Sequence, residues 1–245
     1  MKALLAAVLV FSPAILLRAQ EGQDSKPIWK PEVGDFWTYQ VVVEVQEGTT
    51  LPTGVDGQKI EKLDGKVRAS YMQTSVYRGL KSMKEGGPEV HAFYVSNGDQ
   101  LEEIEYMYIR HDAVEAAGSK QEGKAPKELM PLSKAIPLVR SEWKGGEAFP
   151  FMMDTVVGEQ KIRLVRKFKV LGWETLETDA GKFKALHVQV TGLNGPMEIK
   201  RSYWFTPGTG FIKEVKKYYL GDKTVFTQTR VLEKTGKAQA KPEKE

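Results

Sequence analysis

The chain has 245 residues, of which 41% are hydrophobic and 28% are charged, and it contains no cysteine. The absence of cysteine excludes disulfides, thiol catalysis and cysteine-ligated metals. The formal net charge of +4 comes from the two ends, because Lys2 and Arg18 contribute two positive charges and residues 234–245 contribute a net two more. The rest of the chain is near neutral. This balance excludes the basic excess that is typical of a nucleic-acid-binding domain.

The N-terminal segment has the layout of a secretory signal peptide. Lys2 gives a basic start, an apolar run of about 15 residues extends from Ala3 to Leu17, and small residues lie near Ala19. A membrane-spanning helix needs about 20 residues. We therefore predict that residues 1–19 are a signal peptide, with an uncleaved N-terminal anchor as the alternative. The protein is then exported, to the periplasm or beyond the cell, and keeps no stable membrane span after cleavage.

The remaining chain divides into three parts. Residues 20–30 are polar and interrupted by proline, which predicts a linker. Residues 31–233 form a single domain of a size that can bury a substantial core. Residues 234–245 have no large apolar residue, which predicts a disordered tail.

Alternation and turn signals make the domain all-β. In the opening strand the residues expected to face the core are Trp37, Tyr39, Val41, Val43 and Val45. Asn97-Gly98 predicts a tight hairpin, and the run from Lys161 to Glu233 predicts a meander of four or five strands joined by short loops. Short loops require antiparallel neighbours. We expect nine to eleven strands in a strongly curved, mostly antiparallel sheet, a half-barrel or an open barrel.

Residues 111–147 interrupt this pattern. His111 to Ala117 has the composition of two helical turns, and Pro131 and Pro137 divide the apolar stretch that follows. The segment is too short for a core of its own. We expect a helical or irregular crossover, or a lid.

Three motifs carry a resemblance to a known family. They are Gly34-x-x-Trp37-x-Tyr39, then Thr178-x-Ala180-Gly181-x-Phe183-x-Ala185, and then Tyr203-Trp204-Phe205-x-Pro207-Gly208-x-Gly210-Phe211-Ile212-Lys213. Together they resemble an exported bacterial β-protein family of unknown function, some members of which are labelled TapB-like. The family usually has Pro where this chain has Asp179, and an aliphatic residue where it has Phe211.

That family is similar, more distantly, to the half-barrel carriers of envelope lipoproteins and lipids. Those carriers fold a curved sheet around helices and hold acyl chains inside. The resemblance implies a structural role for the motif residues Gly34, Trp37, Gly181, Phe183, Tyr203, Trp204, Pro207, Gly208 and Gly210. In the turn, Pro207 and Gly208 suit the second and third positions of a type II turn, where the third position needs a positive φ angle.

The sequence offers little catalytic chemistry. His91, His111 and His187 lie at no metal-ligand spacing, and neither a His-Glu-x-x-His helix nor a Gly-x-Ser-x-Gly elbow exists. We predict no catalytic residues, no metal and no cofactor. Glu103 and Glu105 share one face of a strand and could flank a sugar, but the favoured interpretation is a solvated face.

Aromatic and basic residues supply the remaining candidates. Trp204 lies on the polar side of its strand, so it either packs under residues 111–147, which is the favoured interpretation, or lines a groove. Candidate ligand-binding residues are Trp37, Trp204 and Tyr218. The basic face of Lys161, Arg163, Lys167 and Lys169 could meet anionic lipid head groups, although a solvent face is the simpler interpretation.

These observations predict an exported, non-catalytic binding or assembly module of the cell envelope. Its ligand is expected to be apolar or amphiphilic, and its partner a lipid or another envelope protein. Two alternatives stay open: a structural component of an envelope complex, and an enzyme acting on envelope glycans through Glu103 and Glu105.

Overall fold

The computed structural model describes residues 27–49, 51, 57–122, 129–157, 160–194 and 197–238. The predicted signal peptide and residues 239–245 lie outside the described residues. The described chain forms thirteen strands and no helix. The strands are β1 Asp35–Gln46, β2 Lys59–Leu63, β3 Lys66–Ser82, β4 Glu89–Asn97, β5 Gln100–Ile109, β6 Ala113–Gln121, β7 Leu129–Arg140, β8 Ala148–Val157, β9 Gln160–Thr178, β10 Gly181–Asn194, β11 Met197–Thr206, β12 Gly210–Leu220 and β13 Lys223–Lys237.

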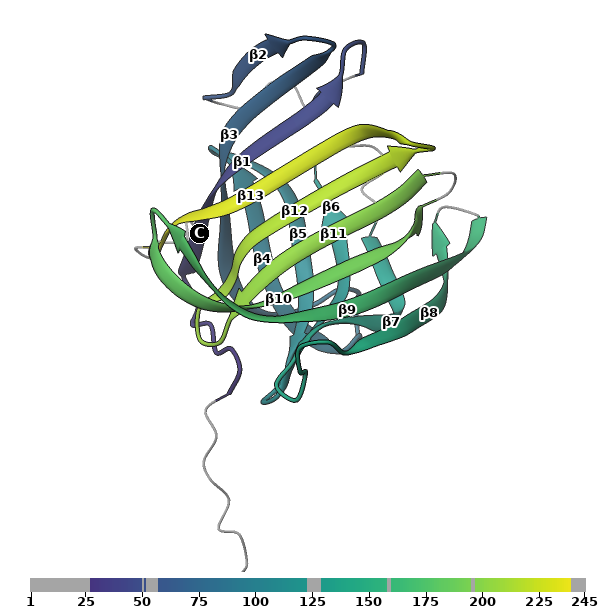
Figure 1. The fold of residues 1–245 in the computed structure, drawn as a ribbon. Helices are drawn as coiled ribbons and strands as arrows, with labels where there is room; N and C mark the ends of the chain where they lie inside the picture. Colours follow the sequence, from purple (N-terminus) through teal and green to yellow (C-terminus); the bar gives the residue numbers. More distant parts are fainter. Residues whose placement is uncertain are drawn as a thin grey trace, which may run out of the picture.

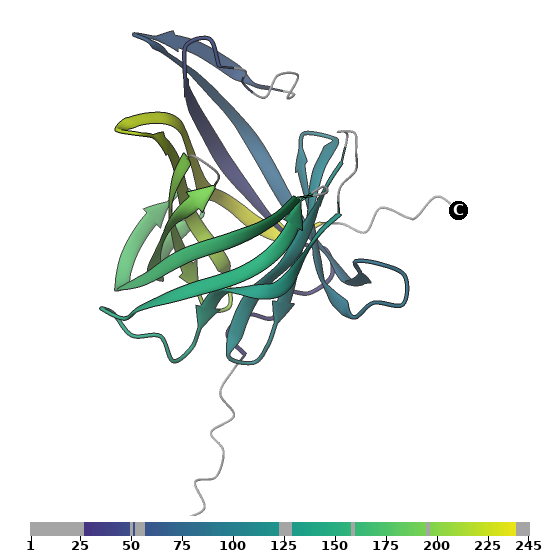
Figure 2. The ribbon, with the colours of Figure 1, turned by 90° about the vertical axis from the view of Figure 1, so that its right-hand side faces the viewer.

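All pairings are antiparallel, and the sheet runs in the order β7-β6-β5-β4-β3-β1-β13-β12-β11-β10-β9-β8. Figure 1 and Figure 2 show the sheet wrapped around until its two end strands, β7 and β8, approach each other. The prediction of a strongly curved antiparallel sheet is confirmed, and the barrel is nearly closed. The short connections keep neighbours antiparallel. The one long-range step pairs β1 with β13 and joins the two halves of the chain.

The alternation of buried and more exposed residues in β1 shows which face of the sheet points into the barrel. All five residues predicted to face the core are buried, from Trp37 at 6% exposed to Val41 at 0%. The Asn97-Gly98 hairpin is also confirmed, with Gly98 at a positive φ of 57° between β4 and β5. Residues directly opposite each other in an antiparallel pair share a face. The register from β1 therefore identifies the inner face of every other strand.

The prediction for residues 111–147 is wrong. Ala113–Gln121 is β6, which pairs β5, and Leu129–Arg140 is β7, which pairs β6. Alanine favours a helix in isolation, but pairing on both sides overrides that local preference. The prolines are accommodated because β7 is an edge strand, where a missing N–H is tolerated. This extra pair accounts for part of the excess over the expected nine to eleven strands.

Both domain boundaries also need correction. Ile28 and Trp29, assigned to a linker, are only 7% and 4% exposed. At the other end β13 continues to Lys237, so residues 234–237 are strand rather than disordered tail. The alternating pattern of the sequence does not extend into either stretch. Both gain their order from partners that are distant in the sequence.

The segment that leads into β1 lies at the lower end of the barrel in Figure 1, and its residues Ile28 and Trp29 are buried. The Ile28 amide donates to the His111 carbonyl at 2.8 Å, and the Gly208 amide donates to the Ile28 carbonyl at 2.9 Å. The Trp29 ring stacks on Phe93 at a centroid distance of 5.1 Å. This short segment therefore links the β5–β6 connection on one wall to the β11–β12 turn on the other.

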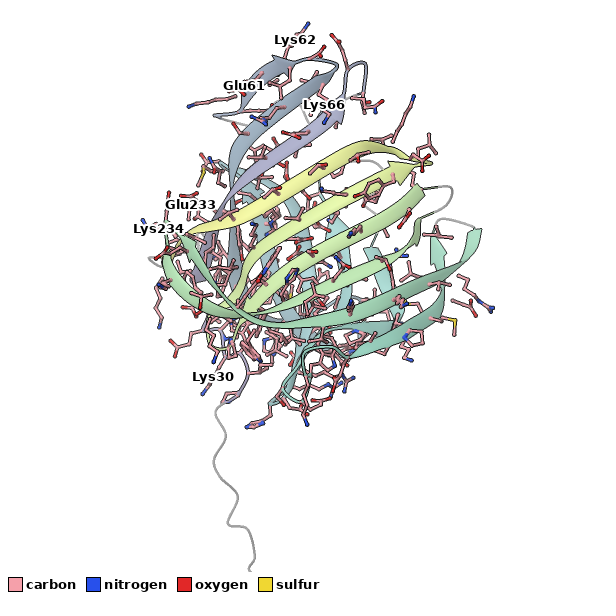
Figure 3. The ribbon with its side chains drawn as sticks, in the orientation of Figure 1. Lys30, Glu61, Lys62, Lys66, Glu233 and Lys234 are labelled. Carbon is pink, nitrogen blue, oxygen red and sulfur yellow. The ribbon has the colours of Figure 1, made fainter. Side chains whose placement is uncertain are left out.

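At the opposite end β2 and the adjoining parts of β1 and β3 project as an arm (Figure 1). Every residue of β2 is exposed, and charged side chains cover the arm, including Glu61, Lys62 and Lys66 (Figure 3). Charge on an edge strand discourages pairing with other chains. Among the described residues no helix has the length and apolarity needed to cross a membrane.

Candidate binding cavity in the barrel interior

The inner face of the barrel carries both apolar and polar side chains. Near the lower end it carries the aromatic rings around Trp29. The inner face also carries all four buried polar residues of the described chain, which are Gln73, Ser75, Asn97 and Glu214. Register places them inside, because Gln73 lies opposite Tyr39 and Glu214 lies opposite Tyr203. The interior is therefore not the uniformly apolar space that an acyl chain requires.

Glu103 and Glu105 belong to this interior. Glu105 lies opposite Phe93 on β4, and Glu103 lies opposite Val95, and both β4 residues are at most 2% exposed. The expectation that these carboxylates form a solvated face is therefore wrong. The sequence pattern assigned the inner face of β5 wrongly, because Ile104 and Tyr106, on the other face of the strand, are buried as well.

A buried ionic cluster lies across the barrel from them. Glu214 Oε1 is 2.8 Å from Arg201 Nε and 3.7 Å from Lys216 Nζ, and Glu214 Oε2 is 3.7 Å from Arg230 Nη1. Burial alone would raise the pKa of Glu214, but the three cations hold that pKa at about 2. Glu214 is therefore ionised at neutral pH. The single negative charge of Glu214 does not neutralise the positive charges of the three cations around it.

Glu105 has the opposite balance. Its nearest cation is Arg230, whose Nη1 lies 3.9 Å from Oε1. Burial, with the nearby charges of Glu103 and Glu214, raises the pKa of the Glu105 carboxyl despite that cation. About 30% of the Glu105 side chain stays accessible, because it borders a cavity.

That cavity has a volume of about 250 Å³. Its lining mixes charged, polar and apolar residues: Glu103, Glu105, Tyr106, Met107, Ala116, Gly118, Ser119, Leu138 and Arg201. A smaller space of about 50 Å³ adjoins it below, shares Glu105, Met107, Leu138 and Arg201 with it, and extends to Trp29 and Trp37. We call the larger space the upper cavity. In the upper cavity, apolar side chains such as Met107 and Leu138 lie beside charged side chains whose charges are not fully neutralised by the protein.

The three predicted ligand-binding residues lie apart. Trp37 is buried at the lower end, where its Nε1 donates to the Thr209 carbonyl at 2.6 Å, and it borders the smaller space but not the upper cavity. Tyr218 is half-buried on the inner face of β12, with its ring 5.3 Å from that of Phe226. Neither borders the upper cavity. The structure does not bring them together with Trp204.

Trp204 lies on the outer face of β11. Its ring stacks on His187 at 4.1 Å, its Nε1 donates to a carboxylate oxygen of Glu174, and Lys213 Nζ lies 5.1 Å from its centroid. The expectation that it packs under residues 111–147 is wrong, because that segment forms the opposite wall. Glu174 of β9 therefore satisfies the indole N–H of Trp204, and His187 of β10 packs against its ring.

Two of the histidines contact neighbouring polar side chains, and two of the basic residues of β9 are exposed. Tyr77 Oη lies 2.8 Å from His91 Nδ1, and His187 Nδ1 lies 3.3 Å from Glu174 Oε1. No group of three potential metal ligands occurs among the residues that the structure describes. On β9, Lys167 and Lys169 are exposed, and Arg163 pairs with Asp154 at 2.8 Å. This face lies outside the barrel, away from the upper cavity.

Three charged residues of the interior were not predicted from the sequence: Arg201, Glu214 and Arg230. A signal was available for Arg201, because it has the same parity as Ile199 and Tyr203 and must therefore face inward with them. Arg230 and Glu214 are recognisable only once β13 is known to pair β1 and β12. Charged residues at inward positions mark a polar interior.

The sequence matches no family model and no curated protein, so the resemblance to the TapB-like family is not confirmed. Two crystal structures are similar over most of the chain. One is a candidate lipoprotein from Parabacteroides distasonis, with TM-score 0.48, 10% identity, and coverage of 87% of this chain and 100% of that one. The other is a candidate exported protein with a YmcC-like fold from Bacteroides fragilis, with TM-score 0.43, 12% identity, and coverage of 85% and 98%. At this similarity neither structure carries an inference about function.

Proposed function

We propose that this protein is an exported, non-catalytic binding module of the cell envelope that takes an amphiphilic ligand into the upper cavity. The observation that carries the proposal is the mixed lining of that cavity. Met107 and Leu138 offer apolar contact, while Glu105 and Arg201 offer charge on facing walls. Ligand sites typically combine a mostly apolar lining with a few placed polar groups.

Export is supported by the N-terminal sequence. The basic start, apolar run and small residues of residues 1–19 direct a chain to the secretory pathway. Sequencing the N-terminus of protein from fractionated cells tests this. We expect a mature chain that begins near Gln20 in the extracytoplasmic fraction. A chain beginning at Met1 in the cytoplasm would contradict export.

Binding is tested by native mass spectrometry of gently purified protein. We expect a bound compound that is lost in Ala116→Phe, because Ala116 lines the upper cavity and a phenyl ring would fill much of it. Met152→Phe is the matched control, since Met152 is 60% exposed. An empty cavity in wild-type protein, with no ligand found by screening, would favour a structural component of an envelope complex.

A second candidate function keeps one specific observation in its favour. Glu103 and Glu105 face the cavity together, and the raised pKa of Glu105 is the property a general acid needs. An enzyme acting on envelope glycans would hydrolyse glycan fragments, and Glu103→Gln would abolish the activity. Binding of a compound without turnover favours the non-catalytic module.

A further inference from the structure

We propose that the upper cavity recognises a zwitterionic group, with an ammonium placed at Glu103 and Glu105 and an oxyanion placed at Arg201. This inference rests on the proposed function and names the chemistry of its ligand. It follows from the two walls of the cavity, which carry opposite charge. Strand β5 presents two carboxylates, and across the interior β11, β12 and β13 present three cations around one carboxylate, Glu214.

The acidic wall is not neutralised by the protein. Within the described chain Glu103 makes no ion pair, and Glu105 reaches only Arg230, at 3.9 Å. Two carboxylates two residues apart on one strand face repel each other and leave a site for a cation. An ammonium between them would remove that repulsion.

The basic wall also keeps unused donors. Arg201 faces Glu214 through Nε at 2.8 Å, and its guanidinium lies 5.1 Å from the Tyr203 ring. Among the described residues Glu214 is the only ion-pair partner of Arg201, which carries five N–H donors, and 30% of the Arg201 side chain remains accessible. Arg201 borders both the upper cavity and the smaller space below it. A planar guanidinium with free donors is suited to a carboxylate or a phosphate.

A ligand with a single charge fits this cavity poorly. An anion alone would meet Arg201 but also Glu103 and Glu105, and a cation alone would meet the carboxylates but also the cationic cluster. Like charges brought together in a desolvated site oppose binding and so provide selectivity. A ligand that carries both charges a few bonds apart satisfies each wall.

The volume limits the size of the group. Pockets for drug-sized ligands range over about 300–1,000 Å³, and the upper cavity, at about 250 Å³, falls just below that range. It fits a head group or a small free zwitterion, not a whole lipid. The shared chemistry is an ammonium with a nearby oxyanion, from either a phosphoethanolamine lipid or a free amino acid or dipeptide.

Isothermal titration calorimetry of the mature chain tests this with five probes. Dihexanoyl phosphatidylethanolamine, glycerophosphoethanolamine and dialanine carry both charges. Dihexanoyl phosphatidylglycerol carries only the anion, and ethanolamine carries only the cation. We expect at least one doubly charged probe to bind about tenfold or more tightly than both singly charged probes. Binding of the lipid but not of glycerophosphoethanolamine assigns a membrane lipid, and tight binding of dialanine assigns a free zwitterion.

Variants locate the binding. Glu103→Gln should weaken binding of the preferred probe about tenfold without loss of fold, because Glu103 is outside the ionic cluster. Arg201→Gln should weaken binding similarly. Because Arg201 also pairs with Glu214, this substitution can lower stability, so its binding is measured at a temperature below the melting temperature of the variant. Glu198→Gln, on the exposed outer face of β11, is the control and should bind normally.

Three results would overturn the inference. They are equal binding of the anionic and zwitterionic lipids, unchanged affinity in Glu103→Gln, and binding of none of the five probes. A compound that co-purifies in the upper cavity while all zwitterions fail would leave the proposed function in place and reject only this chemistry.

Discussion

At the scale of single residues, two carboxylates facing the same barrel interior behave in opposite ways. Glu214 has three cations within 4 Å, which lower its pKa to about 2, whereas burial raises the pKa of Glu105 beside its single, more distant cation. A lowered pKa means that ionisation stabilises the fold, and a raised pKa means that ionisation opposes it. The two residues therefore have different roles, one in stability and one open to a ligand.

This contrast predicts different effects of the same substitution. Glu214→Gln removes the buried anion that three half-buried cations share and should cost about 3–5 kcal/mol at pH 7. Glu105→Gln should leave stability unchanged or higher at pH 7. Because the pKa of Glu214 falls from 4.5 to about 2 on folding, its stabilisation is full above pH 4.5 and is lost as pH falls towards 2.

Urea denaturation of wild type and both variants at pH 7 and pH 3 measures these effects. The acid-induced loss of stability should be smaller in Glu214→Gln than in wild type. Equal destabilisation by both substitutions at pH 7 would contradict the assignment of the cluster.

The Pro207-Gly208 turn gives a second prediction at this scale. Gly208 has a φ of +78°, and the Thr209 amide donates to the Thr206 carbonyl at 3.1 Å, as the sequence predicted for a type II turn. Nothing lies within 4 Å of a Cβ added at Gly208, so the cost of Gly208→Val is backbone strain, about 1–3 kcal/mol. Thermal unfolding should show a lower melting temperature. Thr209→Val, at a position without positive φ, is the control. Equal melting temperatures for the two variants would refute the turn assignment.

At the scale of elements, the short segment before β1 matters more than its length suggests. Trp29 contacts Trp37, Phe93, Phe205 and Phe211, from four different strands, with ring centroids 5.1–6.2 Å away. It also fills the space beside Gly210, where an added Cβ would lie 2.8 Å from the indole ring. This contact explains why a residue without a side chain follows the turn. The segment is part of the core and not a linker.

Trp29→Ala should therefore destabilise the protein by about 3–5 kcal/mol, the usual cost of removing a large buried aromatic ring. Chemical denaturation measures the loss. Val33→Ala, close in sequence but 68% exposed, should change stability by less than about 0.5 kcal/mol. A loss below about 1 kcal/mol in Trp29→Ala would mean that the lower end of the barrel is closed by other residues.

The elements differ in how far the sequence predicts them. Strand β1 and the β4–β5 hairpin are predictable, because strict alternation and a positive-φ turn are local signals. Strands β6 and β7 are not, because their alanines and prolines become strand residues only through pairing with neighbours. The candidate site follows the same rule. Arg201 is identifiable from parity, but its approach to Glu214 and Glu105 depends on how the sheet closes.

At the scale of the whole molecule, the barrel brings together residues from distant parts of the chain. The β1–β13 pairing joins the halves, and wrapping of the sheet sets the acidic wall of β5 opposite the basic wall of β11, β12 and β13 (Figure 2). Neither wall alone defines a site. We propose that the ligand binds in the interior between the two walls.

Nuclear magnetic resonance of isotopically labelled protein, titrated with dihexanoyl phosphatidylethanolamine, tests whether the ligand binds in this interior. Backbone amide shifts report which face of the sheet meets the ligand. We expect the largest changes at residues around the upper cavity, including Glu103, Ser119 and Arg201. Changes confined to the outer face, at Trp204 or Lys169, would contradict it.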